Sequence, residues 1–177
     1  MKLTPVQERF ILHWGEMGTR WGINRTVAQI YALLFVSPKP LDAEEIAETL
    51  TVARSNVSTS IKELQGWGIV RMVHVMGERR DHFEALRDVW ETFRLIVDER
   101  KKRECDPTLM MLRDCVADSK KQGSADEHTQ ARMLEMLSFF ELMSQWVEQT
   151  RKIPTPAIVR TIKLGDKVIK LLGLDKG

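Results

Sequence analysis

The chain has 177 residues, 43% of them hydrophobic, and its 27 lysines and arginines against 25 aspartates and glutamates give a formal net charge of +2. This composition is typical of a globular protein with a real core, and the weak net charge argues against indiscriminate binding to polyanions. No apolar run follows Met1, and no window approaches the roughly 18 uninterrupted apolar residues of a membrane span. We therefore expect a cytoplasmic protein without a membrane segment.

Two helices are predicted at the start of the chain. Thr4 is a suitable N-cap ahead of Pro5, and Asn24 can cap the second helix, which should end at the prolines of residues 37–40. Each helix carries an apolar stripe that needs a packing partner. The stripes consist of Phe10, Ile11, Trp14 and Met17 in the first helix and Val27, Ile30, Tyr31, Leu34 and Phe35 in the second. Glycines at 15, 18 and 22 are expected to weaken the end of the first helix.

A helix-turn-helix is predicted next. Asp42 and Glu45 have the spacing of a capping box, which places a helix over residues 43–50. A second helix over residues 53–67 then carries an apolar stripe that must pack on the first. That stripe consists of Val57, Ile61 and Leu64.

The opposite face of this second helix is small, hydrogen-bonding and cationic. A solvated helix face normally mixes acids with bases, whereas this one has no acid before Glu63. Hydroxyl, amide and guanidinium groups can reach phosphates and base edges in a major groove, so we interpret the helix as a DNA-recognition helix. The predicted DNA-binding residues on it are Arg54, Ser55, Asn56, Ser58, Thr59 and Lys62.

A two-stranded ribbon should follow the recognition helix. Residues 69–75 are rich in β-branched side chains, residues 76–81 form a turn with a glycine, and residues 82–85 return as a second strand. Leu41 is expected to add a strand of one or two residues beside this wing. Together these elements predict a winged helix-turn-helix.

Arginines occupy the wing. Arg79 and Arg80 lie at its tip, where they can enter a minor groove or contact phosphate. Arg71 fits a DNA contact and a structural ion pair equally well. Charge is also uneven here, because residues 42–48 contain four acids and no base, while residues 54–80 contain five bases and two acids.

The segments ARSNVSTSIKELQGWGIV and GERRDHFEA resemble the GbsR branch of the MarR-type (multiple-antibiotic-resistance regulator) transcription factors. The similarity extends from FILHWG at residues 10–15 through the wing and weakens after about Asp106. One departure is Glu78, where the family more often has Asp. The resemblance implies a homodimeric DNA-binding regulator with a winged-helix lobe and an all-helical dimerisation lobe.

Several helices are predicted after the wing. Residues 86–97 repeat apolar side chains at helical spacing, and we expect that helix to end in the charged run 98–104, because Asp106 and Pro107 are a new N-cap and N1 pair. A segment over 109–117 and a polar loop over 120–127 should follow. A last amphipathic helix is expected over 157–172. Its basic stripe, Lys163, Lys167 and Lys170, is interpreted as a solvated face, with contact to flanking DNA as the alternative.

The helix expected over residues 128–150 differs from the others because it is apolar around nearly its whole circumference. Such a helix must be buried on several sides, which in a chain this small indicates a subunit interface. The predicted dimer-interface residues on it are Leu137, Phe140, Met143 and Val147, with Phe10 and Trp14 of the first helix packed nearby.

No chemistry beyond binding is expected. The chain has no phosphate loop or nucleophile elbow, so we predict neither an enzyme nor a cofactor. Two cysteines, Cys105 and Cys115, are interpreted as reduced, buried thiols, with oxidant sensing as the alternative. The four histidines lack metal-binding spacing, so no metal site is predicted. They are His13, His74, His82 and His128.

Five tryptophans are mostly expected to be core residues: Trp14, Trp21, Trp67, Trp90 and Trp146. Because the resembled branch includes a regulator that senses choline, an aromatic pocket for a quaternary ammonium ion is an alternative. A pocket between the lobes for some other small-molecule effector also stays open.

The sequence as a whole predicts a mainly α-helical protein. Residues 24–85 should form the winged helix-turn-helix domain, and residues 1–23 and 86–177 the helical dimerisation region. We predict a homodimeric repressor that binds a pseudo-palindromic double-stranded DNA operator. The alternative is a winged-helix module that binds a protein of the transcription machinery.

Overall fold

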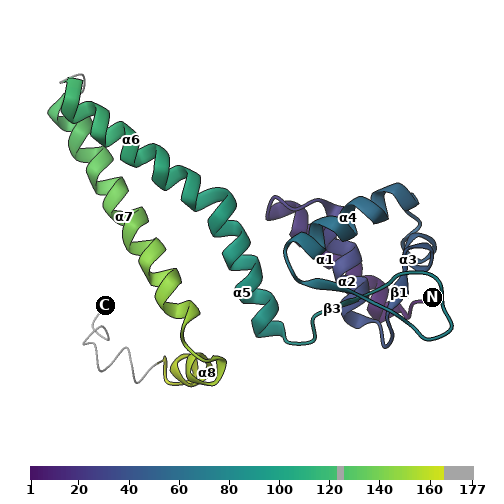
Figure 1. Cartoon of the computed structure of the whole chain (residues 1–177). Helices are drawn as coiled ribbons and strands as arrows, with labels where there is room; N and C mark the ends of the chain where they lie inside the picture. The colour runs from purple at the N-terminus through teal and green to yellow at the C-terminus, as the bar shows by residue number, and fades with distance from the viewer. Residues whose placement is uncertain (123–125, 166–177) are drawn as a thin grey trace. The chain divides into compact units, whose positions relative to one another are not determined.

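The computed structural model describes residues 1–122 and 126–165. The chain divides into two compact units, Met1–Ile96 and Val97–Gly177 (Figure 1). The first unit combines helices with a small sheet and the second is helical, which confirms the predicted fold class. The first unit contains residues 1–23 together with the predicted winged domain.

The first unit begins with α1 (Pro5–Arg20) and α2 (Arg25–Val36), which pack against each other. Both predicted caps are confirmed, because Thr4 forms a capping box and the Asn24 side chain accepts a hydrogen bond from the Thr26 amide at 2.8 Å.

The glycines of α1 have a different role from the expected one. Gly15 and Gly18 lie inside the helix and are buried. A Cβ added at Gly18 would lie 2.5 Å from the Cβ of Ala28 in α2. The two glycines therefore permit a close approach of the helices, and only Gly22, with φ of 74°, follows the helix end in a left-handed conformation.

The helix-turn-helix follows β1 (Leu41–Asp42) and consists of α3 (Ala43–Leu50) and α4 (Arg54–Gly66). The predicted capping box is present: the Glu45 amide donates to Asp42 Oδ1 at 2.8 Å, and the Asp42 amide donates to Glu45 Oε2 at 3.0 Å. The predicted apolar stripe of α4 is buried, with Val57 0%, Ile61 3% and Leu64 1% exposed.

The wing consists of β2 (Val70–Val73) and β3 (His82–Ala85), which pair antiparallel with Val70 opposite Ala85. The strand expected over residues 69–75 is shorter than predicted at both ends. The short strand expected at Leu41 is confirmed, because β1 pairs with β3 in a sheet of order β1-β3-β2.

The helix expected to end in the charged run 98–104 does not end there. Instead α5 (Val89–Arg100) continues through a π-helical turn, η1 (Lys101–Cys105), into α6 (Asp106–Gln122), and Asp106 keeps right-handed helical dihedrals. Pro107 has no amide hydrogen and its ring crowds the carbonyl four residues earlier, so it needs a distorted turn before it. The wider turn, in which the Asp106 amide donates to the Lys101 carbonyl, provides that space.

The second unit is an antiparallel hairpin of α6 and α7 (Glu127–Arg151) (Figure 1). The buried residues of α6 recur at helical spacing, and α7 has no fully buried residue. Three ion pairs follow the hairpin from its open end inward: Asp98 to Arg151 at 3.4 Å, Lys101 to Glu148 at 3.5 Å, and Arg113 to Glu141 at 2.9 Å. The buried α6 residues are Leu109, Leu112, Val116 and Ser119.

Helix α8 (Thr155–Lys163) corresponds to the start of the last predicted helix. The part of that prediction after residue 165, including Lys167 and Lys170, lies outside the described residues. The polar loop expected from residue 120 begins later, because α6 extends to Gln122.

Both cysteines and three of the five tryptophans are more exposed than the sequence predicts. Cys105 and Cys115 are exposed, not buried. Three tryptophans are also not core residues, since Trp21 is 47%, Trp90 37% and Trp146 57% exposed. The cysteines and Trp146 lie on helices whose own unit covers only one narrow stripe, so helical periodicity overestimates how much is enclosed.

Candidate nucleic-acid interface

Helix α4 presents the polar face that the sequence predicts. The predicted side chains are all exposed, on the opposite side from the buried Val57, Ser60, Ile61 and Leu64. Within this face the Thr59 hydroxyl donates to the Ser55 carbonyl at 3.1 Å. The exposed set is Arg54, Ser55, Asn56, Ser58, Thr59 and Lys62.

The N-terminal end of α4 is suited to an anion. Its N-cap is Ala53, which offers no side-chain acceptor, and its first turn contains no acid. No side chain accepts a capping hydrogen bond from the first peptide N–H groups of α4, so these groups can donate to a ligand. The helix dipole adds partial positive charge at this end. Phosphate groups commonly bind at such helix ends.

Arg54 begins α4 and is held by an acid from the preceding helix. Its Nη1 lies 3.1 Å from Glu44 Oε2, and the two side chains are 67% and 43% exposed. Sequence reasoning missed this pair. The acidic content of residues 42–48 was its signal, because a short turn brings that segment beside the start of α4.

The two wing arginines differ in their surroundings. Arg79 is exposed, and none of the described carboxylates lies within ion-pair distance of it. Arg80 Nη1 lies 2.9 Å from Oδ2 of Asp42, whose side chain is only 10% exposed. Of the two wing arginines predicted for DNA contact, Arg80 is therefore ion-paired and Arg79 has no ion-pair partner among the described residues.

Asp42 joins the wing to the start of α3. Burial acts to raise the pKa of its carboxyl group, but the Glu45 amide and the Arg80 guanidinium outweigh burial, so the pKa lies below its usual value. The hydrogen bond from Arg80 and the charge of Asp42 raise the pKa of Arg80. The pair therefore favours the ionised state of both groups.

Arg71 forms a structural ion pair. Its Nη2 lies 2.6 Å from Oε1 of Glu84, the residue opposite it on β3. The sequence left open a DNA contact and a structural ion pair for Arg71, and the structure shows the ion pair.

Asp42, Glu45 and His82 bring potential metal-ligand atoms within 4.8 Å of one another. All four carboxylate oxygens already accept hydrogen bonds, from two backbone amides, from Arg80 and from Lys39 Nζ at 2.7 Å. His82 Nδ1 lies 2.9 Å from the Arg80 carbonyl. Sequence spacing did not show this cluster because β-pairing of Asp42 with His82 creates it, and the two cations already supply its positive charge.

The predicted dimer residues fall into two groups. On α7, Met143 is 41% exposed, whereas Leu137, Phe140 and Val147 are half-buried. Three apolar α7 residues not named in the prediction are more exposed: Phe139 at 55%, Leu142 at 65% and Trp146 at 57%. In the first unit, Phe10 and Trp14 are half-buried and stack with ring centroids 5.4 Å apart.

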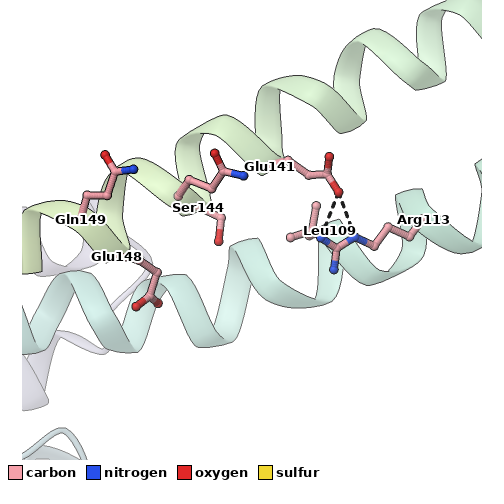
Figure 2. Close-up of a pocket in the computed structure, with 7 residues that line it drawn as sticks. Leu109, Arg113, Glu141, Ser144, Glu148 and Gln149 are labelled. Carbon is pink, nitrogen blue, oxygen red and sulfur yellow. Dashed lines mark hydrogen bonds and ion pairs between the residues drawn. The ribbon is translucent and has the colours of Figure 1, made fainter.

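A shallow groove of about 380 Å³ lies between α6 and α7 (Figure 2). Its one arginine, Arg113, donates through Nε and Nη2 to Oε1 of Glu141 at 3.1 and 2.9 Å. The groove is polar and its cation is already neutralised, so it does not resemble a site for an anionic ligand. Its lining comprises Leu109, Arg113, Glu141, Ser144, Gln145, Glu148 and Gln149.

Comparisons with known proteins connect the winged unit to one family. Residues 21–80 match the MarR family. The chain is 23% identical over 91 residues to the putative HTH-type transcriptional regulator YvaV of Bacillus subtilis, and this match spans about half of each protein (51% of both). It is 21% identical over 136 residues to the HTH-type transcriptional repressor GbsR of the same organism, covering 75% of each.

A solved structure described as a transcriptional regulator has a similar fold, with a TM-score of 0.62 and 22% identity, over 82% of this chain and 95% of that one. The MarR match covers α2 to the tip of the wing, so the predicted DNA-binding residues all lie within it or at its end. The relatives are regulators, in agreement with the prediction that the chain is not an enzyme. Within the described residues, no helix is long and apolar enough to cross a bilayer.

Proposed function

We propose that this protein is a sequence-specific DNA-binding transcriptional regulator whose helix α4 enters the major groove. The observation that carries the proposal is the exposed face of α4, which combines cationic, hydroxyl and amide groups without an acid in its first turn. The MarR match over residues 21–80 and the names of the relatives support it.

The side chains divide by chemistry into two roles. Arg54, at the uncapped helix end, and Lys62 would bind phosphates and position α4. Asn56 lies between them and can form two hydrogen bonds to an adenine edge. Arg79 would reach the DNA from the wing, either at phosphate or in the minor groove.

The proposed assembly is a homodimer on a pseudo-palindromic operator. Two recognition helices must be held about 34 Å apart to enter successive major grooves, and a single winged unit cannot do this. The apolar side chains exposed on α7 supply a surface that a second copy would cover. Kinship with the GbsR branch and a role as a repressor are part of the proposal, supported by the GbsR match. A small-molecule effector is left without an assigned site.

Salt dependence distinguishes this function from the alternative of a protein-interaction module. The full-length protein would be titrated with a library of duplexes from around its own gene, and the bound fragments footprinted. Binding through about six phosphates should weaken by roughly 10³ between about 50 and 200 mM salt. The double variant Arg54→Gln with Lys62→Gln should reduce both the affinity and the salt slope. Absence of salt-sensitive DNA binding would favour the protein partner.

A further inference from the structure

We propose that Glu44 restrains sequence-independent DNA binding by acting as an internal competitor for phosphate at the start of α4. The inference rests on the proposed function and adds a regulatory residue to it. Glu44 lies on α3, outside the set of residues expected to contact DNA, and acts through Arg54.

Three cations of the first unit each form an ion pair with an acid from the segment 42–48. Lys39 pairs with Glu45 at 2.7 Å, Arg80 pairs with Asp42 at 2.9 Å, and Arg54 pairs with Glu44 at 3.1 Å. These acids therefore determine how many cations of the free protein are available to a polyanion.

The three pairs are not equally exchangeable. Asp42 and Glu45 are the two members of the capping box of α3, and their side chains are 10% and 29% exposed. Glu44 is not a member of the capping box, is 43% exposed, and pairs with an arginine that is 67% exposed. A pair this open to water contributes at most about a fivefold change in equilibrium, so a DNA phosphate can displace the carboxylate.

The position of the Glu44 carboxylate explains why it competes with phosphate. It pairs with the guanidinium of Arg54, the first residue of α4, and this end of α4 has no side-chain cap and no acid in its first turn. That end favours an anion, and the carboxylate of Glu44 is paired with its first residue. DNA binding through Arg54 must first release this pair.

Lys62 and Arg79 provide the contrast. Among the residues that the structure describes, no carboxylate is within ion-pair distance of either one. Both are open to phosphate at all times, whereas Arg54 is open only when Glu44 is displaced. Of the four cations predicted for DNA contact, the described structure thus leaves two unpaired, and of the two paired ones Arg54 has the more exposed partner.

The test compares Glu44→Gln with Glu48→Gln on a random-sequence duplex of about three helical turns. Glu48 is a matched control because it lies one helical turn away on α3, is exposed, and forms no ion pair among the described residues. Relative to wild type, Glu44→Gln should tighten binding on the order of fivefold at about 50 mM salt. Its salt slope should be steeper by up to about 0.9, the value for one phosphate contact, because Arg54 contacts phosphate in a larger share of the complexes. Glu48→Gln should give a clearly smaller gain and an unchanged slope.

A double-mutant cycle with Arg54→Gln completes the test. If Glu44 acts through Arg54, Glu44→Gln should have no more effect than Glu48→Gln once Arg54 is replaced. Equal effects of the two glutamate variants, or an undiminished effect of Glu44→Gln without Arg54, would overturn the inference while leaving the proposed function intact. Absence of salt-sensitive DNA binding by the wild-type protein would instead overturn the proposed function.

Discussion

The two units enclose their apolar side chains to very different degrees. In residues 1–96, side chains from α2, the helix-turn-helix and the sheet are wholly enclosed, with Ile30 and Leu33 both 0% exposed. In the described part of the second unit, the buried apolar residues all come from α6. Its α7 instead leaves Phe139, Leu142 and Trp146 each more than half exposed, at 55%, 65% and 57%.

This difference separates two kinds of exposed surface. The exposed face of α4 is polar and lies over a complete core, so it is stable in water and ready to bind a charged partner. The exposed residues of α7 include large apolar side chains, and the hairpin has a narrow core, a combination typical of a protein-protein interface. The first unit is therefore expected to be stable by itself, and the second to gain stability from association.

Replacement of a core residue in the first unit should have the largest effect. Leu33→Ala would remove buried methyl groups and leave a cavity, at a cost of about 2–5 kcal/mol in the free energy of unfolding. Leu12→Ala is the matched control, because Leu12 is 49% exposed on α1 and its loss should cost less than about 0.5 kcal/mol. Urea unfolding followed by circular dichroism measures both. Similar costs would contradict the view that the first unit has a complete core.

An acid placed on the exposed stripe of α7 should separate the proposed dimer. Leu142→Asp would bury an unpaired charge in the interface and weaken association by at least about 100-fold, or about 3 kcal/mol. The hairpin should keep its helical signal because Leu142 is 65% exposed within one subunit. Phe140→Asp should instead destabilise the hairpin, since Phe140 is half-buried there.

Sedimentation of Leu142→Asp at several concentrations measures this effect. Met76→Asp is the control, because Met76 is fully exposed on the wing, so the charge should leave association unchanged. A Leu142→Asp protein that remains dimeric would place the interface elsewhere, and a wild-type protein that is monomeric would contradict the proposed dimer.

The features that were predictable from sequence are those fixed by neighbouring residues. The caps of α1, α2 and α3, the buried stripe of α4 and the bounds of β3 follow from spacings of a few residues. Local hydrogen bonds and helical periodicity decide such features, and both can be read directly.

The features that were missed depend on residues far apart in the chain. The Arg80 to Asp42 pair spans 38 residues and exists because β1 pairs with β3. At Pro107, a local helix-start signal was overridden by the hairpin, which keeps α5 and α6 continuous through a π-helical turn. Ion pairing and helix distortion of this kind are decided by tertiary contacts, which spacing alone does not specify.

Changes on the face of α4 should affect recognition without affecting the core. Asn56→Ala should reduce discrimination by about 1–3 kcal/mol at one base position in each half-site, because a bidentate contact to a base edge is lost. Lys62→Gln is the control, and its loss of a phosphate contact should weaken all sequences alike. Selection of bound duplexes from a randomised library measures both. Uniform weakening by Asn56→Ala would make Asn56 a backbone contact.

The two wing arginines should give the smallest and most easily separated effects, because only one of them is paired. Arg79→Ala should lower the salt slope of DNA binding by about 0.9 per wing and leave the melting temperature unchanged. Arg80→Ala should lower the melting temperature, because Asp42, whose side chain is 10% exposed, loses its cation.

This loss of stability should depend on pH. The pKa of Asp42 is lowered in the folded protein, partly by Arg80, so the pair stabilises the fold above the unfolded pKa of about 3.9 and less as pH falls below it. The difference in melting temperature between wild type and Arg80→Ala should therefore be full near neutral pH and shrink on acidification below about pH 4. If Arg80→Ala flattened the salt slope as much as Arg79→Ala without changing the melting temperature, Arg80 would be a DNA contact and not the residue that fastens the wing to α3.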